Sequence, residues 1–368
     1  MSRIIITKDR MREILASLME ERRVAAPVKD GKVVDYIEVG PDGVQDILMG
    51  DEIAYKSPKE FFFPRCEKII TFKDDEAIAE MPGKGLVLFG ARPCDLEALK
   101  IMTAVFTTGK FEDPFFKANL DASLIIGVAC REKKPACFCD ARETDKAYSE
   151  SCDLFLKNTD EGYEALYVSE KGREALGSYI PGLESLQGND GADGAKSGRP
   201  LSGESALAGD SATPTAATAA PAAPANTPAT SAGDSVKTLS LDKAELDMFD
   251  KIDWEKHTEI CQGCGMCTYI CPTCHCFVFK DVEESGTVCR YRNWDSCMFP
   301  KFTLHASGHN PRASIKERYR QRILHKYSYV KENFGYVACT GCGRCVRSCP
   351  AGMNIKTIVE DIVEELGR

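Results

Sequence analysis

The sequence has no long hydrophobic segment and few histidines. Its longest apolar stretches, such as 86–89 and 124–129, are far shorter than the roughly 20 residues that span a bilayer core, so we expect no membrane span. The chain begins MSRIIITKDR, without the apolar stretch of a secretory signal peptide, and we expect a cytoplasmic protein. Histidine is absent before His257, which deprives cysteines in the preceding residues of their usual general base.

Two phosphate-binding motifs are also absent. No G-x-G-x-x-G follows an expected strand, and no G-x4-G-K-[ST] occurs. We therefore expect the chain to bind no flavin, no NAD and no nucleoside triphosphate. The net charge of -9 disfavours nucleic acid as a partner, because phosphate binding relies chiefly on lysine and arginine.

Cysteine is abundant and unevenly distributed, with 18 in 368 residues. In a reducing compartment such thiols are more often metal ligands or redox groups than disulfides. Six lie in residues 1–186, none in 187–248 and twelve in 249–368. Residues 187–236 are rich in alanine and proline and lack aromatic side chains, so they bury too little apolar surface to fold alone. We expect an N-terminal domain at 1–186, a flexible linker or insertion at 187–236 and a C-terminal domain at 237–368.

The N-terminal region has the pattern of an α/β domain. An amphipathic helix is predicted over 8–22, and the apolar runs 85–90 and 123–130 predict buried strands on either side of a helix over 95–106. A strand, helix, strand unit favours a partly parallel sheet, with ligands at the carboxyl ends of its strands. The predicted class is therefore α+β and multidomain.

The spacing C-x2-C-x2-C-x3-C-P occurs twice, as CQGCGMCTYICP at 261–272 and CTGCGRCVRSCP at 339–350. This spacing is typical of bacterial ferredoxins, in which three cysteines of a run bind one 4Fe-4S cluster and the fourth binds the other cluster. Structural zinc sites use paired C-x2-4-C units instead. The runs predict a dicluster ferredoxin core that carries out one-electron transfer. The predicted ligand sets are Cys261, Cys264, Cys267 and Cys349 for one cluster, and Cys339, Cys342, Cys345 and Cys271 for the other.

The segment between the runs is basic and predicts a helical insertion. Residues 290–331 contain ten lysines and arginines against two acidic residues. A helix is expected from Asn310-Pro311, with Ile315, Tyr319, Ile323 and Tyr327 on its buried stripe, and a last helix is expected over 354–366. The arginines could raise cluster potentials, dock an acidic partner or solvate a face, and the third is the simplest interpretation.

Four further cysteines form a second constellation. Cys94 follows the first predicted strand, Cys130 ends the second, and Cys137 and Cys139 lie in the next turn. All four are expected at one sheet edge, which predicts a third 4Fe-4S cluster, although the spacing matches no standard ferredoxin run. The alternatives are reduced structural thiols, a zinc site, or a nucleophilic Cys94.

The other cysteines give weaker signals. Cys274 and Cys276 follow a cluster loop, so we interpret them as packing around it without binding metal. The pair His305 and His309 could bind zinc on a helix, but Gly308 and Asn310-Pro311 argue against a helix there. No role is assigned to the remaining four, which are Cys66, Cys152, Cys289 and Cys297.

Several segments together resemble one family of proteins. They are G90ARPCDLEAL99, C261QGCGMCTYICPTCHCF277, R292NWDSCMF299, G308HNPR312, R318YRQR322 and C339TGCGRC345. They resemble the iron-sulfur subunit shared by anaerobic sulfite reductase, as its A subunit, and soluble sulfhydrogenase, as its beta subunit. The resemblance covers both terminal regions but not the Ala/Pro-rich segment. It implies a subunit that relays electrons between a flavoprotein oxidising NAD(P)H and a separate catalytic oxidoreductase subunit.

The expected function is therefore non-catalytic electron transfer within a cytoplasmic oxidoreductase complex of the sulfite reductase, hydrogenase or heterodisulfide reductase type. Two alternatives stay open. One is a self-sufficient reductase with a substrate site in the N-terminal domain, which an incompletely ligated iron would favour. The other is an iron-sulfur regulatory protein whose basic segment binds nucleic acid, which salt-dependent binding would favour.

Overall fold

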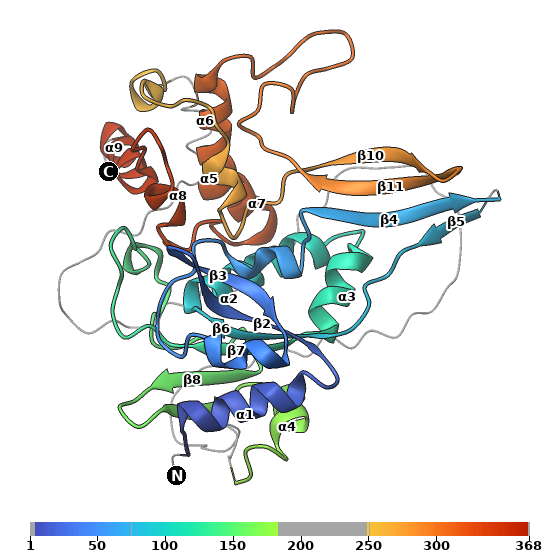
Figure 1. Cartoon of the computed structure of the whole chain (residues 1–368). Helices are drawn as coiled ribbons and strands as arrows, with labels where there is room; N and C mark the ends of the chain where they lie inside the picture. The colour runs from blue at the N-terminus through green and yellow to red at the C-terminus, as the bar shows by residue number, and fades with distance from the viewer. Residues whose placement is uncertain (1–3, 75, 183–248, 250, 367–368) are drawn as a thin grey trace. The chain divides into compact units, whose positions relative to one another are not determined.

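A mixed sheet forms the centre of the N-terminal region (Figure 1). The computed structural model describes residues 4–74, 76–182, 249 and 251–366. The strands of this sheet are β1 (Ile5–Ile6), β2 (Arg23–Asp30), β3 (Val33–Val39), β6 (Leu86–Ala91), β7 (Leu124–Val128), β8 (Leu154–Asn158) and β9 (Tyr163–Tyr167). Their spatial order is β1-β9-β8-β7-β6-β2-β3. Because β2, β6, β7 and β8 are parallel neighbours and the outer pairs are antiparallel, the predicted partly parallel sheet is confirmed.

Helices cover both faces of this sheet. They are α1 (Lys8–Leu18) and α4 (Glu170–Leu176) on one face, and α2 (Pro93–Thr107) and α3 (Pro114–Ala122) on the other. Val87 and Phe89 pack with the first pair, whereas Leu86 and Leu88 pack with the second. Side chains alternate along a strand, so β6 is buried on both faces, which explains its continuous apolar run. The predicted strand, helix, strand unit is confirmed as β6, α2 and β7, and α1 confirms the first predicted helix.

A second, antiparallel sheet combines strands from both ends of the chain. Its strands are β4 (Cys66–Lys73), β5 (Glu76–Ala79), β10 (Phe277–Glu284) and β11 (Thr287–Trp294), in the order β10-β11-β4-β5 (Figure 1). Arg292 of β11 is buried and forms an ion pair with Glu67 of β4 at 2.5 Å and another with Asp113. The described residues on either side of the Ala/Pro-rich segment form one compact unit. The insertion predicted at 187–236 lies outside the described residues.

The C-terminal region is mainly helical. Its helices are α5 (Met266–Tyr269), α6 (Ile315–Leu324), the π-helical turn η6 (His325–Tyr329), α7 (Val330–Phe334), α8 (Arg344–Arg347) and α9 (Ile355–Glu365). Short 3-10 turns are η1 (Pro41–Asp46), η2 (Pro58–Phe61), η3 (Asp140–Arg142) and η5 (Lys256–Thr258). Among the described residues, no helix has the length and apolar character needed to cross a membrane.

The basic insertion contains the predicted helix, but the helix starts later than expected. Ser314 caps α6: its Oγ accepts from the backbone N of Glu317 at 3.3 Å, and its own backbone N donates to the Glu317 carboxylate at 2.7 Å. The predicted cap at Asn310-Pro311 was therefore wrong, because Asn310 Oδ1 accepts instead from the Arg312 backbone N within a turn. The predicted core stripe is confirmed for Tyr319, Ile323 and Tyr327, which are buried, whereas Ile315 at the start of the helix is half-buried.

Candidate metal centres

Each cysteine run forms a tight loop that leads into a short helix, α5 or α8. The residues that cap these helices, Gly265 and Gly343, have φ angles of 75° and 71°, a conformation that favours glycine. A Cβ on Gly265 would lie 2.6 Å from the ring of Phe299, and one on Gly343 would lie 2.3 Å from the carbonyl oxygen of Ala136. Both glycines therefore permit the turn and the close approach of a neighbouring segment.

The first predicted ligand set gathers around one cavity of about 470 Å³. Cys261 lies near Cys264, Cys267 and Cys349, and all four line this cavity. The backbone N of Met353 donates to Cys349 Sγ at 3.3 Å. Burial raises the pKa of the Cys261 thiol, so an unligated thiol here would stay protonated. The structure brings together three cysteines of the first run and the last cysteine of the second.

The second predicted set gathers around another cavity, of about 300 Å³. Cys345 lies near Cys271, Cys342 and Cys339, and all four line it. The Thr273 hydroxyl lies 3.3 Å from Cys271 Sγ. Cys345 lines the first cavity as well, so the two thiol-lined spaces are neighbours.

Three buried cations surround these thiols without an acidic partner. Lys59 of η2, Arg322 of α6 and Lys326 of η6 are 7 %, 2 % and 3 % exposed. Within the described residues, none of them forms an ion pair with aspartate or glutamate. A buried charge is costly unless a counter-charge compensates it. These side chains therefore fit an anionic group in the adjoining cavities, as a thiolate-ligated iron-sulfur cluster would be.

The contacts of Arg322 and Lys326 also fit an anionic group in these cavities. Arg322 Nε donates to Cys267 Sγ at 3.0 Å, whereas its buried Nη1 has no hydrogen-bond partner among the described residues. Arg322 also lines the first cavity, where a group carrying sulfide acceptors would satisfy this donor. Lys326 Nζ donates to Thr273 Oγ1 at 2.9 Å and to the Ala338 carbonyl at 2.7 Å.

Four of the basic residues that we interpreted as a solvated face are buried, so this interpretation was wrong for Arg292, Arg318, Arg322 and Lys326. The last three repeat every four residues along α6 and η6. Each immediately precedes a residue of the apolar stripe. This shared periodicity is the signal that could have revealed their burial.

Lys59 is a functional candidate that sequence reasoning missed. Its Nζ donates to the carbonyl oxygens of Cys271 at 3.0 Å and Cys274 at 2.8 Å, and it lies 4.0 Å from the centre of the Trp294 ring. Burial lowers the pKa of Lys59 to about 8, although the neighbouring Cys274 and Cys271 thiols oppose this shift. It comes from an ordinary charged stretch of the N-terminal region, so no local pattern marked it.

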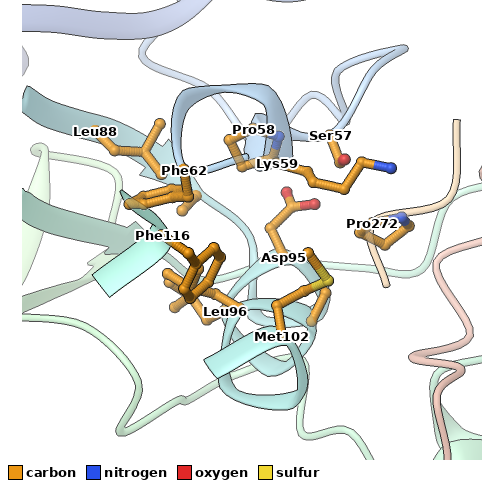
Figure 2. Close-up of a pocket in the computed structure, with 13 residues that line it drawn as sticks. Ser57, Pro58, Lys59, Phe62, Leu88, Asp95, Leu96, Met102, Phe116 and Pro272 are labelled. Atoms are coloured by element: carbon orange, nitrogen blue, oxygen red, sulfur yellow. The ribbon is translucent and has the colours of Figure 1, made fainter. Parts of the chain in front are cut away.

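A mostly apolar cavity of about 340 Å³ lies between η2, α2 and Pro272 (Figure 2). Its two charged lining residues are Lys59 and Asp95, and both already have partners. Asp95 and Arg344 form a two-point ion pair, at 2.6 and 3.1 Å, in which both side chains are fully buried. Since Arg344 lies in the second cysteine run, this pair fastens the start of α2 to that loop.

The four cysteines of the second constellation lie together. Cys94, Cys130, Cys137 and Cys139 line a third cavity, of about 340 Å³, at the carboxyl ends of β6 and β7. Cys342 of the second ferredoxin set lines it too. The turn that carries Cys137 and Cys139 is held to the ferredoxin loop by a bond from the backbone N of residue 138 to the carbonyl of residue 341, at 2.8 Å.

The remaining cysteines occupy different environments. Cys66 is exposed, Cys152 and Cys289 are buried, and Cys276 and Cys297 hydrogen-bond to each other. The residues 305 and 309 do not lie on a helix, as expected; they flank a turn and are joined by a backbone hydrogen bond of 2.9 Å. In the described part of the chain, no three cysteine, histidine, aspartate or glutamate side chains are grouped around a single metal-ion position.

Comparison with known proteins agrees with this arrangement. Residues 260–353 match the family described as a 4Fe-4S dicluster domain. The chain is 27 % identical over 357 residues to sulfhydrogenase 2 subunit beta of Pyrococcus furiosus, a match that covers 96 % of each chain. No solved structure matches. The chain is therefore an iron-sulfur protein with a 4Fe-4S dicluster domain, similar along nearly its whole length to a sulfhydrogenase beta subunit, as its sequence predicted.

Proposed function

We propose that this chain is the electron-transfer subunit of an oxidoreductase complex. It would relay electrons between a flavoprotein linked to NAD(P)H and a catalytic subunit of the hydrogenase, sulfite reductase or heterodisulfide reductase type. The name of its relative, a sulfhydrogenase subunit beta, supports a complex with other subunits. Each 4Fe-4S cluster would supply one-electron transfer. The chain itself would hold the clusters and bind neither flavin nor NAD.

The observation that carries this proposal is a row of three thiol-lined cavities. Cys345 lines both the first and the second cavity, and Cys342 lines both the second and the third. Redox groups bound in such adjoining cavities would suit the relay of electrons better than catalysis at a single isolated site. We assign the eight ferredoxin cysteines to two clusters in the sets described above. We also assign Cys94, Cys130, Cys137 and Cys139 to a third 4Fe-4S cluster.

Buried positive charge supports these assignments and tells against nucleic-acid binding. Arg322, Lys326 and Lys59 compensate the negative charge of ligated thiolates from inside the protein. Cations that serve this purpose are withdrawn from the surface, so the basic segment offers fewer groups to a phosphate backbone.

The iron content of the full-length protein tests the relay. We expect anaerobically purified protein to contain about twelve irons per chain and little zinc, and we expect Cys137→Ala to lower this by about four. The spectroscopic signals of the two ferredoxin clusters should persist in that variant. The measurement is metal analysis combined with electron paramagnetic resonance of the reduced protein.

The matched control is Cys152→Ala, which removes a thiol that lines none of these three cavities. Its iron content should equal that of the wild type. A wild-type protein that saturates at about eight irons would eliminate the third cluster but retain the ferredoxin pair. Stoichiometric zinc in place of iron would refute the electron-transfer function as a whole.

Replacing Arg322 with methionine should lower the reduction potential of the cluster assigned to Cys267. The wild-type guanidinium donates to Cys267 Sγ at 3.0 Å and stabilises the more negative, reduced state. We expect a shift of some tens of millivolts, since a tenfold change in a one-electron equilibrium corresponds to about 59 mV. Potentiometric titration would measure it, with Lys316→Met as the control, because Lys316 is on the same helix but its side chain is 40 % exposed. An unchanged potential would contradict the assigned role.

A further inference from the structure

Cys276 and Cys297 meet at the base of the β10–β11 hairpin. Cys276 immediately precedes β10, and Cys297 follows the end of β11. The first residue of β10 faces the last residue of β11, and the backbone N of Asp295 donates to the Cys276 carbonyl at 2.9 Å. The hairpin therefore fixes the separation of the two segments, and the two thiols lie within hydrogen-bonding distance of each other.

Positive charge surrounds this pair. Lys59 and Lys326 lie near Cys276, and Arg322 lies near Cys297. Such an environment favours the thiolate, which is the form that attacks disulfides. The hydrogen bond from Cys297 lowers the pKa of Cys276 to about 7. Both residues are half-buried rather than fully buried.

The surroundings of this pair distinguish it from the three ligand sets. The predicted cluster ligands line cavities, whereas neither Cys276 nor Cys297 lines any of the three described thiol-lined cavities. They are instead arranged to bond to each other.

We propose that Cys276 and Cys297 form a redox-active dithiol that closes reversibly into a disulfide at the base of this hairpin. Closure joins the two Sγ atoms and removes one proton and one electron from each thiol. With a small disulfide as oxidant, the Cys276 thiolate attacks one of its sulfurs, and Cys297 then resolves the mixed disulfide. Two small thiols are released in total, and an excess of thiol reverses the reaction.

This pair would give the protein a two-electron group close to Cys271, which is assigned to the second cluster. Only one residue separates the pair from Cys271: Cys297 lies near Cys274, and Cys274 hydrogen-bonds to Cys271. Formation of this disulfide involves only the two thiols and their surroundings, and it does not depend on the number of clusters.

The experiment is an anaerobic redox titration of the iron-loaded, full-length protein in glutathione buffers of graded composition. After each equilibration, free thiols are alkylated and the peptides are mapped by mass spectrometry. We expect one reversible disulfide, Cys276 to Cys297, with a loss of two alkylated thiols per chain and no loss of iron. Cys276→Ser and Cys297→Ser should each abolish this disulfide and keep the wild-type iron content. Cys66→Ser removes an exposed thiol and should leave the titration unchanged.

Two results would overturn the proposal. One is a wild-type protein in which both thiols stay alkylatable from fully reducing to fully oxidising buffer. The other is a loss of iron or zinc in Cys276→Ser or Cys297→Ser, which would make these residues metal ligands. Because peptide mapping is performed on the wild type, the first result does not depend on whether a variant folds.

Discussion

Replacing Asp95 with asparagine is expected to lower the free energy of unfolding by about 3–5 kcal/mol, the usual cost of removing one partner from a buried ion pair. Asparagine keeps the shape of the side chain but leaves the charge of Arg344 buried without compensation. Both partners are fully inaccessible to solvent in the wild type. Asp95 also accepts from the Arg92 backbone N at 3.3 Å, at the start of α2. Chemical denaturation followed by circular dichroism would measure the loss.

The control for this variant is Asp9→Asn. Asp9 also pairs with an arginine, Arg12, but its side chain is 90 % exposed. Surface pairs contribute about 0–1 kcal/mol, so this change should be nearly neutral. Replacing both members of the buried pair, as Asp95→Leu with Arg344→Met, should recover part of the stability, because no buried charge is then left without a partner. An Asp95→Asn protein as stable as the Asp9→Asn control would show that the pair does not stabilise the fold.

Replacing Cys349 with alanine should remove the cluster assigned to the first cysteine run, with a loss of about four irons per chain. Cys349 belongs to the second run, yet it lies beside Cys261 and lines the same cavity. Without it, only three thiolates remain for that cluster. Iron analysis and electron paramagnetic resonance of the reduced protein would measure the loss.

Two further variants make the assignment unambiguous. The spectrum of Cys349→Ala should match that of Cys264→Ala, which removes a ligand from the same set, and should differ from that of Cys342→Ala. If it matched Cys342→Ala instead, the exchange of ligands between the two runs would be refuted.

Much of the protein could be derived from local sequence patterns. The duplicated cysteine spacing predicted the dicluster domain, because three cysteines at such short intervals can bind one cluster. Continuous apolar runs predicted β6 and β7, since strands covered on both faces need no polar alternation. The position of Cys94 and Cys130 after consecutive parallel strands predicted that they would lie together, because such strands end at the same sheet edge.

Other features depend on contacts between distant parts of the chain. Asp95 and Arg344 are 249 residues apart, and β4 pairs with β11 across the Ala/Pro-rich segment. Neither the burial of Lys59 nor the pairing of Cys276 with Cys297 leaves a periodic trace in the sequence.

The sequence by itself therefore predicted which residues would bind iron, because ligand spacing and strand ends are local properties of the chain. Only the tertiary structure decided where the compensating charges lie and how the N-terminal sheet is fastened to the ferredoxin loops. A lysine or aspartate has the same local signature on the surface and in the interior. Its burial becomes favourable only when a partner from elsewhere in the chain satisfies its charge.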